Sequence, residues 1–175
     1  MKKFSADTFE QLYKEYSDKI FSYIYLLVND KEDAEDLTQD TFIKVYRNLD
    51  KLYGKSNLFP WLFSISRNVT LDYFGKKSLL TTFSLDKYQF ESNQQTPLEL
   101  IMKGERMNIL YEAIHNLHLS YQKVLILRKI KELSIKETAE ILNWNENRVK
   151  ITTSRAIAAL KRELMKKRKN YDEII

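Results

Sequence analysis

Hydrophobic residues recur at intervals of three and four along most of this chain, a spacing that places them on one face of an α-helix. The first stripe runs from Thr8 to Val28 and contains Phe9, Leu12, Tyr13, Tyr16, Ile20, Ile24, Leu27 and Val28. Asp30 can cap a second helix, whose apolar side carries Ala34, Leu37, Thr41, Val45 and Leu49. The pattern therefore predicts two successive amphipathic helices.

A third predicted helix, over residues 58–74, has a mixed surface. Its sequence is LFPWLFSISRNVTLDYF, in which aromatic residues stand among Arg67, Asn68 and Asp72. Pro60 suits the first turn, where its missing N–H costs nothing, and Gly75 is expected to end the helix. Neither an ordinary core helix nor an ordinary surface helix explains this combination of residues.

Periodicity fails between Lys76 and Gln95, where Ser, Thr, Asn and Gln accumulate ahead of Pro97. This composition predicts a linker between two domains, with an ordered loop docked on one domain as the alternative. Helical periodicity returns afterwards, and the predicted helices are Leu98–Leu117, a helix capped by Ser120, Ser134–Leu142 and Glu146–Met165. The predicted fold class is all-α, with two small helical domains at 1–77 and 98–175 joined by a flexible linker at 78–97.

Composition supports this organisation and narrows the function. The 175 residues include only three Gly and two Pro, which favours long helices. The absence of cysteine excludes disulfides and thiolate metal sites and fits a reducing compartment. The chain shows no signal peptide and no apolar run long enough to span a membrane, so we expect a cytoplasmic protein.

The sequence contains no pattern typical of an enzyme. It has neither a glycine-rich phosphate loop nor a nucleophile motif. His115 and His118 have a spacing that can bind a metal, but no cysteine and no obvious third ligand accompanies them. We therefore predict no catalytic residues, no metal, no cofactor and no small-molecule substrate.

Positive charge is concentrated at the C-terminal end. The net charge is +5, and residues 146–175 alone hold 9 basic and 4 acidic side chains. A basic helix at one end of a near-neutral protein indicates a polyanionic partner, most simply nucleic acid. The alternative is a lysine-rich tail that maintains solubility.

The segment from Ser134 to Leu164 is typical of a helix–turn–helix. Ser134 and Glu137 form a capping-box pattern, Ala139 is small enough for a close helix crossing, and Asn145 can cap the second helix after a short turn. The predicted buried positions of that helix are Val149, Ala156 and Leu160, and its outward face carries Arg148, Lys150, Ile151, Thr152, Ser154 and Arg155. Such a face fits the major groove of DNA, although two ordinary helices joined by a polar turn would also give much of this pattern.

Two further motifs precede it: DAED-x-x-QD-x-F in the second helix, and F-x-WL-x-x-I-x-RN-x-x-x-D in the third. In this order, followed by the helix–turn–helix, they resemble a bacterial RNA polymerase sigma factor of the extracytoplasmic-function (ECF) group of the sigma-70 family. The resemblance covers nearly the whole chain. It implies a minimal member with only regions 2 and 4.

The resemblance implies a transcription initiation factor whose partners are core RNA polymerase, through the β′ clamp helices and the β flap, and promoter DNA. By this similarity Asp36, Gln39, Asp40 and Tyr46 would bind core polymerase. Phe63, Arg67 and Asn68 would contact the melted −10 strand, whereas Trp61 is expected in the core. The outward residues of the last helix would contact the −35 element. The family is commonly held inactive by an anti-sigma factor, sometimes at the membrane.

Some positions depart from the family pattern. Thr152 and Thr153 stand where basic residues are common, Asn143 replaces a turn glycine, and Ile151 is apolar where a small polar residue is frequent. These changes leave the −35 sequence preference open. Two other functions also stay open: a helix–turn–helix regulator that binds duplex operator DNA as a dimer, and a helical adaptor whose basic tail binds RNA or membrane.

Overall fold

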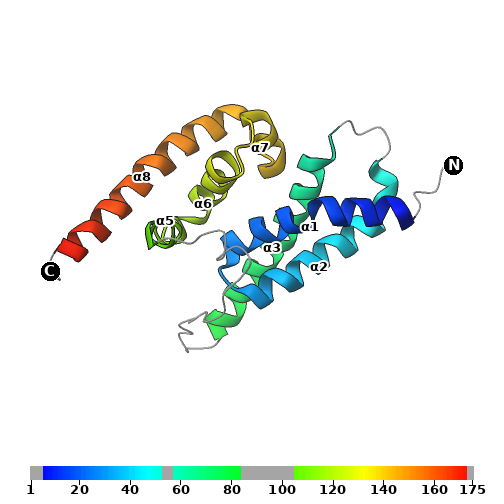
Figure 1. The fold of residues 1–175 in the computed structure, drawn as a ribbon, viewed down its shortest axis with the longest axis horizontal. Coiled ribbons are helices and arrows are strands. Elements are labelled where there is room, and N and C mark those ends of the chain that lie inside the picture. Colours follow the sequence, from blue (N-terminus) through cyan, green and yellow to red (C-terminus); the bar gives the residue numbers. More distant parts are fainter. Residues whose placement is uncertain (1–5, 53–56, 84–104, 173–175) are drawn as a thin grey trace. The chain divides into compact units, whose positions relative to one another are not determined.

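The structure is a computed structural model that describes residues 6–52, 57–83 and 105–172. Within these ranges every regular element is helical and no strand occurs, so the all-α prediction is confirmed. The elements are α1 (Ala6–Val28), α2 (Lys31–Arg47), the 3-10 helix η1 (Leu49–Leu52), α3 (Leu58–Phe83), α5 (Glu105–His115), α6 (Leu119–Leu125), the π-helical segment η2 (Ile126–Ile130), α7 (Ile135–Leu142) and α8 (Glu146–Asp172) (Figure 1).

The chain divides into two compact units, Met1–Gln94 and Gln95–Ile175. The predicted helix end at Gly75 is wrong, because α3 continues through it to Phe83. A glycine inside a helix costs only about 1 kcal/mol, and Lys77, two residues later, donates a 2.6 Å hydrogen bond from Nζ to Tyr73 Oη within the same helix. The predicted linker 78–97 is thus helical up to residue 83, and the remainder of that prediction lies outside the described residues.

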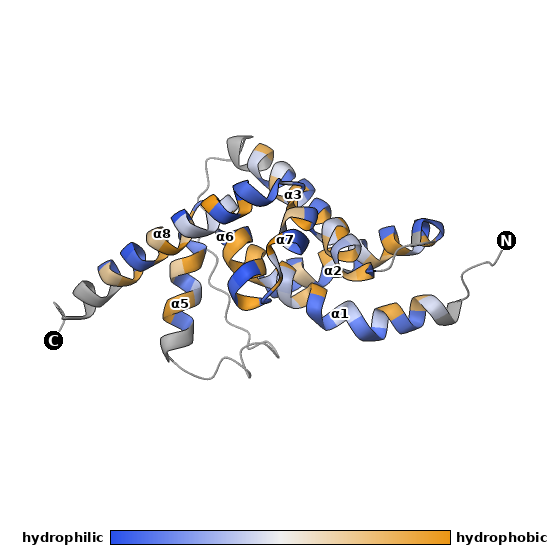
Figure 2. Ribbon diagram, turned by 90° about the horizontal axis from the view of Figure 1, so that it is seen from above, coloured by the Kyte–Doolittle hydropathy of each residue, from blue (hydrophilic) through white to orange (hydrophobic). Residues whose placement is uncertain are grey.

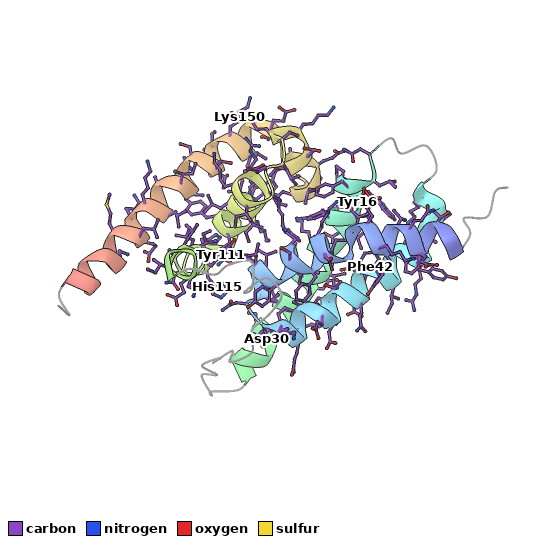
Figure 3. The ribbon with its side chains drawn as sticks, in the orientation of Figure 1. Tyr16, Asp30, Phe42, Tyr111, His115 and Lys150 are labelled. Atoms are coloured by element: carbon purple, nitrogen blue, oxygen red, sulfur yellow. The ribbon has the colours of Figure 1, made fainter. Side chains whose placement is uncertain are left out.

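In the first unit α1, α2 and α3 each pack against the other two (Figure 1). Asp30 caps α2 as predicted, accepting a 2.9 Å hydrogen bond from the backbone N–H of Asp33, and it lies at the beginning of that helix in Figure 3. The core contains Leu12, Ile20, Tyr23, Ile24 and Leu27 from α1, Ala34, Leu37, Phe42 and Val45 from α2, and Leu62, Phe63 and Val69 from α3.

Four buried hydroxyl residues lie within this apolar core. Each hydroxyl donates a hydrogen bond to a backbone carbonyl of its own helix: Thr38 to Ala34 at 2.7 Å, Thr41 to Leu37 at 2.7 Å, Ser66 to Phe63 at 2.9 Å and Thr70 to Ser66 at 2.8 Å. Because each polar group is satisfied locally, its burial carries little penalty. This bonding explains how a segment as polar as 58–74 can supply one side of the core.

In the second unit α8 packs against α5, α6 and α7. Figure 2 shows that hydrophilic positions recur along α8, whereas α6 contributes the buried apolar residues Val124 and Leu125. The predicted cap at Ser120 is wrong: α6 begins at Leu119, and His118 Nδ1 accepts a 3.3 Å hydrogen bond from the backbone N–H of Ser120. A histidine nitrogen can cap as a side-chain oxygen does, an exchange that residue preferences alone do not reveal.

The predicted helix–turn–helix is present. Ser134 Oγ accepts from the Glu137 N–H at 3.1 Å, and the Glu137 carboxylate accepts from the Ser134 N–H at 2.9 Å. Asn143 ends α7 in the left-handed conformation, with φ 53°, which asparagine tolerates better than most residues. Asn145 Oδ1 then accepts a 2.7 Å hydrogen bond from the Arg148 N–H and so caps α8.

Among the helices that the structure describes, none combines the length and the hydrophobicity that crossing a bilayer would require.

Candidate polymerase- and DNA-binding surfaces

The four residues predicted to bind core polymerase lie on the exposed side of α2. Asp36, Gln39 and Asp40 are all exposed, and Tyr46 is 60% exposed. Ile43, which the sequence reasoning did not single out, is 48% exposed and lies one helical turn from Gln39 and Asp40. The face is therefore acidic at one end and apolar at the other, an arrangement that suits a protein partner.

An aromatic cluster extends this surface onto α1. The Tyr46 ring lies 5.3 Å from the Phe9 ring, and the Phe42 ring lies 4.8 Å from the Tyr13 ring, both edge-on. Phe42 is buried between α1 and α2 (Figure 3), whereas Tyr13 is 45% exposed. In the sequence Phe9 and Tyr13 belong to the apolar stripe of α1, and the exposure of Tyr13 depends on how α1 packs on α2.

The opposite edge of the α2 face borders a groove of about 220 Å³ between α2 and α3, whose walls include Asp40, Lys44, Arg47, Tyr73 and Lys76. Lys44 and Asp72 form an ion pair across it, with Nζ 3.5 Å from Oδ2. Near the start of α2, Tyr73 donates a short hydrogen bond to Asp33, and Lys77 lies 3.8 Å from the same carboxylate. Desolvation and the Asp33 carboxylate both raise the pKa of Tyr73, so this phenol keeps its proton and links α3 to α2.

The prediction that Phe63 contacts DNA is wrong. Its side chain is 0% exposed and stacks on Phe59 with ring centroids 4.2 Å apart. It also lies 5.3 Å from the ring of the fully buried Tyr23. Phe63 therefore belongs to the core of the first unit, where it lies against Tyr23 of α1.

The other two predicted −10 residues remain accessible. Asn68 is exposed and Arg67 is half-buried, and Arg67 Nη1 donates a 3.1 Å hydrogen bond to Asn68 Oδ1. This bond engages the amide oxygen and uses neither of the amide N–H groups. Burial raises the pKa of Tyr23, and the charge of Arg67 partly offsets that rise.

Trp61, which is expected in the core, is half-buried, so part of its ring is accessible. It precedes Asn68 by seven residues, and both therefore occupy the same side of α3. The i, i+7 spacing of Trp61 and Asn68 is evident in the sequence. Which of Trp61 and Phe63 is accessible to DNA depends on how α3 packs in the first unit.

The six residues predicted to contact the −35 element lie on the accessible side of α8. Arg148, Lys150, Ser154 and Arg155 are exposed, Ile151 is 44% exposed, and Thr152 is half-exposed. Figure 3 shows Lys150 on the outer side of the helix. On the inner side Val149 and Ala156 are buried as predicted, whereas Leu160 is only half-buried.

A surface depression of about 430 Å³ borders this helix, and Ser120, Tyr121, Trp144, Arg148, Ile151 and Arg155 are among the residues that line it. The Arg148 guanidinium lies over the Trp144 ring, 4.2 Å from its centroid. Within the described residues no three potential metal ligands come together. The accessible groups of this surface are thus cationic, amide, hydroxyl and apolar, which are the groups that bind phosphates and base edges.

Comparisons with known proteins agree with this organisation. The family model described as "Sigma-70 region 2" matches residues 12–79, and that described as "Sigma-70, region 4" matches residues 107–160. The chain is 33% identical to the ECF RNA polymerase sigma factor SigX of Bacillus subtilis (strain 168), over 96% of this chain and 90% of that protein. It is 31% identical to RNA polymerase sigma factor YlaC of the same organism, over 93% of this chain and 95% of that protein.

Two solved structures share the fold. One is the sigma factor RpoE of Bartonella quintana in complex with the anti-sigma factor NepR, with a TM-score of 0.73 and 22% identity over 91% of this chain and 98% of that one. The other is CnrH in complex with the cytosolic domain of CnrY, with a TM-score of 0.68 and 21% identity over 92% of this chain and 90% of that one. Matched in both regions and along nearly its full length, the chain belongs to the ECF group of the sigma-70 family and is a promoter-directing transcription initiation factor.

Proposed function

We propose that the two units of this sigma factor bind core polymerase and both promoter elements. The exposed α2 face, with Asp36, Gln39, Asp40 and Tyr46, docks on the β′ clamp helices of core polymerase. The acidic residues provide electrostatic complementarity, and Ile43 and Tyr46 supply apolar area, because interfaces depend on buried apolar and aromatic anchors. The second unit contacts the β flap and the −35 duplex.

The exposed side of α3 captures the melted −10 strand. Trp61 offers the accessible part of its half-buried ring for base stacking, which contributes roughly 1–3 kcal/mol per base. Asn68 directs its amide N–H groups toward base acceptors, while Arg67 holds the amide through the 3.1 Å hydrogen bond. Flipping a base costs a few kcal/mol, so one stacking contact and one pair of hydrogen bonds are of the size needed to hold an open strand.

The helix α8 lies in the major groove at −35, with its basic tail along phosphates. Arg148, Lys150, Ile151, Thr152, Ser154 and Arg155 supply the base and backbone contacts. Phosphate contacts add affinity and salt dependence, whereas base-edge contacts supply sequence choice.

The mechanism is differential binding. The factor binds the open −10 strand better than the duplex, and this difference shifts the melting equilibrium toward the open complex. The chain itself performs no covalent chemistry, and the polymerase synthesises the RNA. The observation that carries the proposal is the accessibility of two chemically different faces, acidic–apolar on α2 and basic on α8, in separate units.

An anti-sigma factor regulates the chain by covering the same surfaces, and the factor acts in the cytoplasm, where that regulator can also hold it at the membrane. Two proteins with this fold are found in complexes with an anti-sigma factor or with a cytosolic partner domain. The exposed apolar residues Tyr13, Ile43 and Tyr46 offer such a partner a contiguous site. Copurification of a stable inhibitory complex from the host would support this regulation, and repeated recovery of the free factor alone would contradict it.

The test is run-off transcription with purified core polymerase on fragmented host DNA, with and without the full chain. Discrete transcripts that depend on the chain are expected, and their start sites would define the −10 and −35 elements. The Asp36→Arg variant is the matched negative control. A footprint on duplex DNA by the chain alone, without chain-dependent transcripts, would refute the proposed function and favour a duplex-binding regulator.

A further inference from the structure

An aromatic–cation pair occupies the turn of the helix–turn–helix. The Arg148 guanidinium stacks over the Trp144 ring at 4.2 Å, within the range of a favourable cation–π contact. Arg148 is exposed and Trp144 is half-buried. The pair thus lies at the surface, at the N-terminal end of the helix proposed to enter the major groove.

The backbone on both sides of the pair is fixed. The Trp144 N–H donates a 2.9 Å hydrogen bond to the Ala139 carbonyl, and the preceding residue, Asn143, is held in the left-handed conformation. The Arg148 N–H is bound by Asn145 Oδ1 at 2.7 Å. The backbone that carries the indole and the backbone that carries the arginine are therefore both held in place before any ligand binds.

A guanidinium that packs its face on an aromatic ring keeps its N–H edge available, and that edge matches two adjacent acceptors on one base. In the major groove guanine presents such a pair, O6 and N7. Trp144, Arg148, Ile151 and Arg155 also line one depression of about 430 Å³, so the pair is continuous with the rest of the accessible α8 face.

We propose that Trp144 is a positioning residue that orients Arg148 to read a guanine at one edge of the −35 element. The inference rests on the proposed function, and it assigns a specificity role to a turn residue outside the outward face of α8. Trp144 itself acts through Arg148. Removing the indole should consequently affect discrimination at one base pair rather than affinity for every sequence.

The test uses holoenzyme assembled from core polymerase and the full chain. Competition binding on promoter duplexes, each with one base pair of the −35 element changed, gives the discrimination at each position at constant salt. Arg148→Ala should lose about tenfold of the preference for guanine at a single position, and Trp144→Leu should lose most of the same preference. Trp144→Tyr, which keeps an aromatic face, should restore it.

Two controls separate positioning from loss of structure. Tyr111→Leu removes an aromatic ring from α5 of the same unit, outside this depression, and should leave that preference unchanged. In an Arg148→Ala background, Trp144→Leu should cause no further loss. Equal weakening on all duplexes, or losses that multiply in the double variant, would overturn the inference.

Different results would refute −35 reading by α8 and the positioning role of Trp144. If the wild-type holoenzyme starts transcription specifically but shows no preference at any −35 base pair, −35 reading by α8 is refuted together with the role of Trp144. If the preference exists and Trp144→Leu retains it, only the positioning role is refuted. Should Trp144→Leu fail to fold, Arg148→Lys, which keeps the charge and loses the planar fork, must lose the same preference for the inference to stand.

Discussion

Replacing Phe63 with alanine tests the reassignment of this residue from DNA contact to core. The side chain is 0% exposed, stacks on Phe59 at 4.2 Å and lies 5.3 Å from Tyr23. A phenylalanine that contacts DNA would be dispensable for folding. A phenylalanine in this position joins α3 to α1, because Tyr23 belongs to α1.

The expected magnitude follows from burial. A buried aromatic side chain removes about 150–250 Å² from water, which at about 25 cal/mol per Å² amounts to roughly 4–6 kcal/mol as an upper estimate. Alanine retains part of this area but leaves a cavity, and buried Phe→Ala substitutions destabilise by about 3–5 kcal/mol. Because domains of this size are stable by only about 5–15 kcal/mol, the first unit should be near the limit of folding at 37 °C.

The chain provides its own reporter for the measurement. It contains two tryptophans, Trp61 in the first unit and Trp144 in the second. In a Trp144→Phe background, the fluorescence of Trp61 follows the urea unfolding of the first unit alone. We expect Phe63→Ala to lower the free energy of unfolding by about 3–5 kcal/mol, with a smaller loss for Phe63→Leu, which refills part of the cavity.

Asn68→Ala is the matched control on the same helix. Asn68 is exposed, so its replacement should change the stability by no more than about 0.5 kcal/mol, spare core binding, and still impair opening of the −10 element, as measured by permanganate reactivity of promoter thymines. An unfolding curve for Phe63→Ala that matches the parent, together with a specific defect in opening, would refute the core assignment.

Three further predictions concern other parts of the molecule. Asp36→Arg should abolish co-purification with core polymerase while the helical circular dichroism signal is retained. Asp18→Arg, the same charge reversal at an exposed position of α1, should bind core polymerase normally. Normal binding by Asp36→Arg would contradict the docking assignment. Ser134→Ala removes the capping box of α7 and should destabilise the second unit by about 0.5–2 kcal/mol; an unchanged urea midpoint, followed by Trp144 in a Trp61→Phe background, would argue against the cap. Burial lowers the pKa of Lys131 from its ordinary 10.5 to about 8. Between these two pH values the unfolded chain binds more protons than the folded chain. The free energy of unfolding of the second unit should therefore rise as the pH rises above about 8, by at most about 1.4 kcal/mol per pH unit. Lys131→Met should flatten this rise, and a rise that persists in that variant would assign it to another group.

The sequence alone determined which segments are helical and where most of them begin. Asp30, Ser134 and Asn145 cap their helices as predicted, because a cap is a local hydrogen bond between residues three apart. The helix–turn–helix and the acidic face of α2 were also predictable, because hydrophobic periodicity along a helix indicates which of its sides is buried. The predictions of helix ends failed where two local conformations have nearly the same free energy. Gly75 lies inside α3 instead of ending it, and His118 caps α6 in place of its neighbour Ser120.

Only the tertiary structure decided what the aromatic residues do. Phe63 and Trp61 are two residues apart and chemically similar, and the choice between them depends on which flank of α3 meets α1 and α2. The same packing leaves Tyr13 and Tyr46 accessible beside the acidic α2 face, and the left-handed Asn143 with the cap at Asn145 brings Arg148 over Trp144. These contacts join residues whose relation depends on helix crossing and turn geometry. Burial and ring stacking depend on which helix surfaces meet in the folded protein, so they cannot be predicted from the hydrophobic periodicity of a single helix.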